Sequence, residues 1–170
     1  MVNLKIILEN INSIIKHSKR EIFKNFLQNN NPDIVLITET KLNSRHKIHF
    51  QNYSCIRADR IIQPNPSSCG GGTLILIKNG LLFTEINCTN YTSFECCTIK
   101  IHLQNSKFLF ISSIYHTPYH GHSIDTNELN SLLQLFNNNP FVIGGDFNAR
   151  HSYWNNNINC VNGKKCLNGI

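Results

Sequence analysis

The sequence lacks the features that would place it in a membrane or in a disulfide-rich secreted scaffold. No apolar run in its 170 residues approaches the roughly 18 residues that a membrane-spanning helix needs, and a signal peptide is not expected. The seven cysteines are an odd number without CxxC spacing, which argues against a disulfide framework and against a zinc site. We therefore expect reduced thiols in an intracellular protein that has no membrane partner.

Charged residues are also scarce, at 15% of the chain against roughly 25% in an average domain. The 16 Lys and Arg residues nevertheless exceed the 10 Asp and Glu residues, which gives a net charge of +6. This excess is local, because residues 1–60 contain ten basic and five acidic side chains, a net charge of +5. Such a distribution suits the binding of an anionic polymer near one point, although a solvated helix face would give the same pattern.

The first part of the chain contains a strand, a helix and a second strand. An apolar strand is predicted at 3–8, and the spacing of Ser18–Glu21 is that of a capping box that opens a helix. An Asn-Asn-Asn-Pro sequence at 29–32 ends that helix, because Pro cannot continue it. The apolar run at 33–38 is typical of a strand covered on both faces, and it ends at Glu39.

A later part of the chain repeats this order. A strand ends at Tyr115, the residues 125–128 have capping-box spacing, and apolar side chains follow at helical intervals. This helix also ends in Asn-Asn-Asn-Pro, at 137–140. The strand at 141–143 then leads through two glycines to Asp146. The repeat predicts two similar units, each with a carboxylate after its second strand.

Three further strand-like runs lie between these units. They cover 53–59, 72–78 and 95–103, with turns expected at 63–71 and 87–92. The length fits one domain. We therefore expect a single α/β domain over residues 1–170, with two stacked sheets and a helix outside each.

Polar residues occupy the carboxyl ends of four predicted strands, where α/β sheets place ligands. These residues are Asn12, Glu39, Tyr115 and Asp146. A carboxylate in such a place is solvated, paired or bound to a cation, because burying it alone is very costly. Sparse oxygen ligation favours Mg²⁺, with Mn²⁺ as the alternative, over Zn²⁺, which would recruit His or Cys. An ion pair with an arginine or the capping of a helix are the structural alternatives.

The segment Gly144–His151 gathers several functional residue types. If it stays extended, Asp146 and Asn148 point the same way and pair a base with a neutral amide. Asp-x-Asn also forms ordinary Asx turns, so the segment taken alone does not decide between these interpretations.

Four motifs in this order resemble the endonuclease/exonuclease/phosphatase superfamily, and within it the endonuclease domain of jockey-type non-LTR retrotransposons. The motifs are Asn10-Ile11-Asn12, Thr38-Glu39-Thr40, Tyr115-His116-Thr117-Pro118 and Gly145–His151 through Trp154. The resemblance covers nearly the whole chain. It implies a DNase I-like, four-layer α/β sandwich of two stacked mixed sheets flanked by helices.

The resemblance also implies a role for each site residue. Glu39 would bind Mg²⁺ with Asn12 beside it, and Tyr115 would contact the scissile phosphate. Asp146 would orient or deprotonate the attacking water, and Asn148 would stabilise the phosphorane. Such parts suit phosphodiester hydrolysis, because charge gathers on the nonbridging oxygens in the transition state.

The implied partner is DNA, reached in the nucleus, with a reverse transcriptase following in the full-length polyprotein. We expect four side chains to contact the DNA, and they are Arg45, Lys47, Arg150 and His151.

One departure concerns the region after Asp146. The family continues to a second Asp and to a Ser-Asp-His motif, whereas the last histidine here is His151. We therefore expect the domain to be incomplete at its C-terminus, without the last strands, and weakly active or inactive. The alternatives are a superfamily phosphatase or sphingomyelinase acting on small phosphoesters, and a non-catalytic nucleic-acid-binding remnant.

Overall fold

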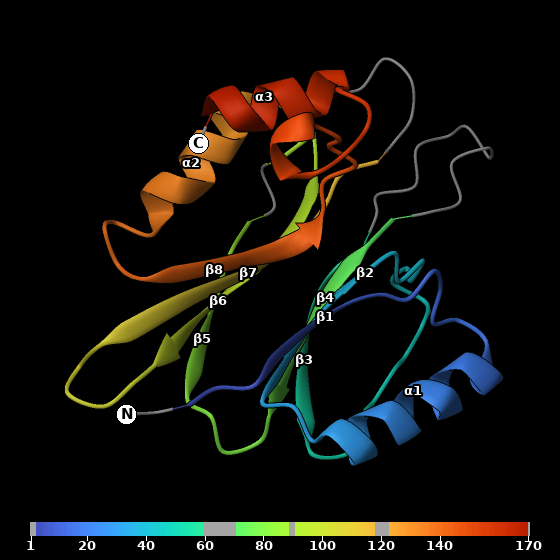
Figure 1. The fold of residues 1–170 in the computed structure, drawn as a ribbon. Coiled ribbons are helices and arrows are strands. Elements are labelled where there is room, and N and C mark those ends of the chain that lie inside the picture. Colours follow the sequence, from blue (N-terminus) through green and yellow to red (C-terminus); the bar gives the residue numbers. More distant parts are fainter. Residues whose placement is uncertain (1–2, 60–70, 89–90, 118–122, 170) are drawn as a thin grey trace.

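The computed structural model describes residues 3–59, 71–88, 91–117 and 123–169. Its strands form two four-stranded sheets that stack on each other, with α1 outside one sheet and α2 and α3 outside the other (Figure 1). The elements are β1 (Ile6–Asn10), α1 (His17–Asn30), β2 (Ile34–Thr38), β3 (Tyr53–Ala58), β4 (Thr73–Lys78), β5 (Phe83–Ile86), β6 (Glu95–His102), β7 (Phe108–Tyr115), α2 (Thr126–Leu135), β8 (Phe141–Asp146), the short 3₁₀ helix η1 (Ser152–Trp154) and α3 (Val161–Gly169).

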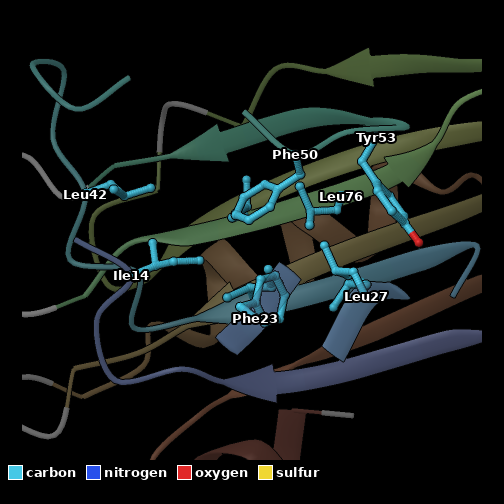
Figure 2. Packing of buried hydrophobic residues seen from close by; sticks show 10 residues of the cluster. Ile14, Phe23, Leu27, Leu42, Phe50, Tyr53 and Leu76 are labelled. Atoms are coloured by element: carbon cyan, nitrogen blue, oxygen red, sulfur yellow. The ribbon is translucent and has the colours of Figure 1, made fainter. Parts of the chain in front are cut away.

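The first sheet has the strand order β1-β2-β4-β3. β1 and β2 run parallel because α1 carries the chain back between them, and the other pairs are antiparallel. Phe23 and Leu27 of α1 are buried against this sheet, in a cluster with Phe50 and Leu76 (Figure 2). Every residue of β2 is buried, as expected for a strand covered on both faces.

The second sheet has the order β5-β6-β7-β8, with β7 and β8 parallel and joined by α2. Leu129 and Leu132 of α2 pack with Phe110 and Ile114 of β7. In the part of the chain that the structure describes, β8 pairs only with β7, and Phe141 at its start is 49% exposed.

A third apolar cluster lies between the sheets. Leu36 of β2 and Ile75 of β4 meet Ile99 of β6 and Ile111 of β7 there, all of them almost fully buried. The outer helices therefore make four layers with the two sheets, and this confirms the α/β sandwich predicted from the repeat. None of the described helices combines the length and the apolar character needed to cross a membrane.

The start of α1 differs from the prediction. The capping box at Ser18–Glu21 does not form, because the helix begins at His17 and its N-cap is Lys16, which makes no side-chain capping bond. The end of the helix agrees with the sequence, since Asn31 takes the left-handed conformation and donates its N–H to Leu27.

Three elements, β5, η1 and α3, were not predicted. β5 is a four-residue strand with partly exposed side chains, and α3 follows an Asn-rich stretch without a clear apolar period. α3 is fixed from outside, because Asn162 accepts the N–H of Ile124, and Lys165 Nζ donates to Ser123 Oγ at 2.7 Å. Most of the turn expected at 63–71 lies outside the described residues, as does part of the turn expected at 87–92.

Candidate active site

Polar residues from four strand ends meet where the two sheets touch. Asn10 ends β1 opposite Thr38, the residue before Glu39, and Tyr115 ends β7 opposite Asp146 of β8. β8 packs against β1 and β2 of the other sheet. The sandwich therefore brings together carboxylates that are far apart in the sequence.

The Asn10 side chain connects these carboxylates. Its Nδ2 donates to Glu39 Oε1 at 2.8 Å and to Asp146 Oδ2 at 3.1 Å, and its Oδ1 accepts the N–H of Asn12 at 3.2 Å. Both amide hydrogens are used by these bonds. One carboxylate from each sheet thus faces a single neutral amide. The sequence named Asn10 within the Asn10-Ile11-Asn12 motif but gave the role in the site to Asn12.

The backbone around Glu39 is held in an unusual conformation. Glu39 and Lys41 have φ angles of 55° and 57°, which non-glycine residues rarely adopt. Backbone hydrogen bonds from Thr40 N to Gly72 O at 3.2 Å and from Lys41 N to Gly71 O at 2.8 Å hold this segment. Such conformations cluster at functional sites when the surrounding structure enforces them.

Asn12 lies beside the site but makes different contacts from those expected. Its Oδ1 accepts a hydrogen bond from Lys41 Nζ at 2.7 Å, and its carbonyl accepts one from Lys19 Nζ. Asn12 therefore contacts the ammonium groups of two lysines, while Asn10 contacts the carboxylates. The signal that could have distinguished the two residues is the strand register, because Asn10 is the last paired residue of β1.

The segment after β8 turns at once instead of staying extended. Asp146 Oδ1 accepts the N–H of Asn148 at 3.0 Å in an Asx turn, and Asn148 has a φ of 44°. The Asn148 side chain then donates to His116 O at 2.7 Å. The extended interpretation was wrong, but the turn still places both functional groups at the ends of β7 and β8.

Tyr115 stands next to Asp146 in the parallel register of β7 and β8, and its side chain is 5% exposed. The following residue, His116, donates from Nδ1 to Ser93 O at 2.7 Å. Tyr115 is thus at the site but largely inside the core, and its contact with a phosphate stays a prediction.

Arg45 and Lys47 are exposed on the loop after Glu39. Arg57 holds this loop by donating to Asn43 O and His46 O, both at 2.7 Å. The arginine is itself fixed by a two-pronged ion pair with the carboxylate of Asp59, the residue after β3. The exposed side chains of Arg45 and Lys47 therefore lie on a loop that Arg57 holds by hydrogen bonds.

The two residues predicted to bind DNA after Asp146 differ from each other. Arg150 is exposed, whereas His151 Nδ1 accepts the N–H of Tyr153 at 3.1 Å and caps η1. The His151 ring also lies 5.4 Å from that of Trp154. His151 is used inside its own segment, so its DNA contact stays a prediction.

Cys160 fastens the same segment. Its Sγ accepts N–H groups from Arg150 at 3.0 Å and from Gly163 at 3.3 Å. Burial alone would raise the pKa of this thiol, but these and neighbouring N–H groups lower the pKa below its usual value. The six cysteines in the described part of the chain carry free thiols.

The donor set at the site suits a hard divalent cation. Two carboxylates, Glu39 and Asp146, and several amide oxygens are available there. The described residues contain no group of three or more His, Cys, Asp or Glu side chains that could hold a metal ion. Mg²⁺ fits such a sparse set, because it is bound by one or two carboxylates and keeps several waters.

The two stacked mixed sheets with flanking helices have the DNase I-like fold. The chain belongs to the endonuclease/exonuclease/phosphatase family, whose sequence pattern matches residues 10–166.

The relatives among known proteins come from mobile elements. The RNA-directed DNA polymerase from mobile element jockey of Drosophila melanogaster is 28% identical over 95% of this chain, and the probable polymerase from transposon BS of the same species is 25% identical over 98%. The chain spans 16% and 18% of the length of these relatives.

Solved structures with the same fold include the endonuclease domain of TRAS1, a telomere-specific non-LTR retrotransposon. It matches 98% of this chain and 70% of its own, with a TM-score of 0.71 at 11% identity. The human Nocturnin catalytic domain matches 86% of this chain and 64% of its own, with a TM-score of 0.65 at 16% identity. At these identities the likeness concerns the fold alone.

Proposed function

We propose that this chain is a Mg²⁺-dependent endonuclease that nicks target DNA for retrotransposition. The observation that carries the proposal is the Asn10 amide, which holds Glu39 and Asp146 together from two different sheets. Paired carboxylates beside a neutral donor suit the hydrolysis of a phosphodiester, whose transition state is anionic. The relatives are polymerases of mobile elements, which makes DNA the expected substrate.

Glu39 would hold the cation, with Asn12 beside it. The Oε2 atom of Glu39 accepts no hydrogen bond from the described residues, whereas Oε1 accepts one from Asn10. When bound there, Mg²⁺ offsets the charge that develops on the phosphate oxygens. Lys41, which is hydrogen-bonded to Asn12, adds positive charge near the same point.

Asp146 would accept a proton from the attacking water. Its Oδ1 and Oδ2 are each held by one N–H donor, which fixes the carboxylate without neutralising it. Asn148 uses one N–H on His116 O, and an amide has two, so the second can donate to a phosphorane oxygen. Tyr115, next to Asp146, would contact the scissile phosphate.

The exposed side chains of Arg45, Lys47 and Arg150 supply charge for the DNA backbone. We place the reaction in the nucleus, with a reverse transcriptase in the same polyprotein.

We expect slow cleavage by this chain. The two histidines in the site motifs serve other contacts through Nδ1, His116 with Ser93 O and His151 as the cap of η1. The sequence has no histidine after His151, and loss of one member of a catalytic set can reduce the rate by orders of magnitude.

The test is nicking of supercoiled plasmid in Mg²⁺, followed by the appearance of the open circular form. The expected result is slow nicking that EDTA and Asp146→Ala both abolish, while Arg45→Ala weakens DNA binding in a salt-dependent way. Release of phosphate from small phosphoesters without any DNA nicking would instead identify a phosphatase. Salt-dependent DNA binding without nicking, unchanged by Glu39→Ala, would identify a non-catalytic remnant.

A further inference from the structure

The segment after the site exposes two aromatic side chains. Tyr153 is 79% exposed, the highest fraction among the exposed large hydrophobic side chains in the described part of the chain. Trp154 beside it is 37% exposed, and the two rings meet edge to face at 6.5 Å. A single exposed hydrophobic residue is ordinary, but a pair of large rings next to a candidate active site needs a further reason.

These rings are held on a braced turn. Trp154 Nε1 donates to Ala149 O at 3.0 Å, and the Tyr153 N–H is fixed by His151 Nδ1. Ser152 N donates to Asn159 Oδ1 at 2.7 Å, and Cys160 N donates to Arg150 O at 2.9 Å. The backbone that carries the exposed rings is therefore fixed before any partner binds, which lowers the entropy lost on binding.

The same contacts connect the rings to the site. The Trp154 side chain donates a hydrogen bond to the carbonyl of Ala149. The residue before Ala149 is Asn148, whose N–H donates to the carboxylate of Asp146. The exposed guanidinium of Arg150 lies in the same segment. An aromatic face beside a cation is the combination on which nucleic-acid-binding proteins stack bases, because the ring takes the base and the cation takes the backbone.

We propose that Tyr153 is a stacking platform for a nucleobase of the DNA strand bound at the site, with Trp154 supporting it from the side. This proposal rests on the proposed endonuclease function and adds a base contact to it. Stacking tolerates every base, so the platform positions the strand without selecting a sequence.

Binding is measured by fluorescence anisotropy of a labelled oligonucleotide in EDTA, so that the DNA stays intact. Tyr153→Ala should weaken binding about tenfold, whereas Tyr153→Phe should keep it, because stacking on one ring has about this effect. The matched control is Leu82→Ala, which removes a side chain of similar exposure, 74%, in the turn between β4 and β5. This control should leave binding unchanged.

Two readouts separate stacking from a structural effect. Trp154 is the only tryptophan of the chain, so its fluorescence should change with DNA but not with heparin, a polyanion without bases. An abasic residue moved along the oligonucleotide should weaken binding by wild type at one position, and should have no further effect there in Tyr153→Ala.

The outcomes distinguish the two proposals. DNA binding that is unchanged in Tyr153→Ala, with constant Trp154 fluorescence, would overturn the platform and leave the endonuclease proposal intact. Absence of any DNA binding by wild type would overturn both. An equal effect of the abasic residue in wild type and in Tyr153→Ala would also overturn the platform.

Discussion

The two strand-helix-strand units, β1-α1-β2 and β7-α2-β8, follow the same order and each ends in a carboxylate of the site. They differ in burial, because β2 lies inside its sheet with all residues buried, whereas β8 starts with exposed Phe141. They also differ in how the carboxylate is held. Glu39 follows its strand in a left-handed conformation, while Asp146 ends its strand and accepts the N–H of the Asx turn. Two units with the same order of elements therefore hold their carboxylates in different backbone conformations.

The helices of the two units also begin differently. α2 is capped by Asp125, whose side chain accepts the N–H of Asn127 at 2.8 Å. Glu128, expected to complete a capping box, instead accepts four hydrogen bonds from Thr92 and Ser93 in another part of the chain. α1 has no side-chain cap. The start of α2 therefore contacts another part of the chain through Glu128, whereas no side chain caps the start of α1.

The largest expected effect comes from the side chain that joins the units. Asn10→Leu removes both N–H donors and leaves the carboxylates of Glu39 and Asp146 to repel each other. Plasmid nicking should fall about 100- to 1,000-fold, as for the loss of a preorganised donor. Asn12→Ala is the matched comparison and should cost less than about tenfold, because Asn12 contacts lysines instead. Equal losses in both variants would contradict the assignment of Asn10.

The next effect tests why the second unit has glycines before its carboxylate. A Cβ at Gly145 would collide with the backbone carbonyl of Ile114. A Cβ at Gly144 would instead approach side-chain ends, with Leu36 Cδ1 at 2.7 Å and Leu8 Cδ1 at 3.7 Å. Gly145→Ala should lower the free energy of unfolding by about 3 kcal/mol and Gly144→Ala by about 1 kcal/mol. Urea denaturation measures both. A larger loss of unfolding free energy in Gly144→Ala than in Gly145→Ala would contradict this order. It would show that β7 and β8 move apart more easily than the two stacked sheets do.

A smaller, pH-dependent effect is expected at Glu128. Burial alone would raise the pKa of this carboxyl, but the N–H and O–H donors of Ser93 and Thr92 lower the pKa below its usual value of 4.5. A carboxyl whose pKa is lower in the folded state than in the unfolded state stabilises the fold at a pH above the unfolded-state pKa. This stability is lost as the pH falls through the folded-state pKa. Glu128→Gln should therefore destabilise the protein at neutral pH by about 1 kcal/mol, after allowance for solvent screening.

Thermal melts at pH 7 and pH 3 test this prediction. The difference between wild type and Glu128→Gln should be present at pH 7 and shrink at pH 3. The control is Glu21→Gln in α1, since Glu21 pairs with Lys24 on the surface and should leave the melt at pH 7 nearly unchanged. A difference for Glu128→Gln that does not change with pH would mean that the carboxylate charge is not what stabilises the loop.

The sequence predicted the layers better than the contacts within the site. Apolar runs bounded by Pro and Gly identified β2 and β8, and the repeated order identified the two sheets. The choice between Asn10 and Asn12 depends on the register of β1 with β2 and on the contact between the sheets, and neither is encoded locally. α3 was missed for a similar reason, since bonds such as that of Lys165 to Ser123 fix it from outside.

The smallest expected effect concerns the uncapped start of α1. The N-cap residue Lys16 already has the extended conformation of a capping residue, with φ −70° and ψ 136°, but its side chain accepts no backbone N–H. Lys16→Asp should supply that acceptor and place a negative charge at the positive end of the helix dipole, which adds about 0.5–1 kcal/mol of stability. Asp125→Ala in α2 should lower stability by about the same amount, and Lys16→Ala separates the new cap from the mere loss of a lysine. If Lys16→Asp and Lys16→Ala have the same melting temperature, the start of α1 does not depend on capping of its first turn. It is then set by the packing of Phe23 and Leu27 on the sheet.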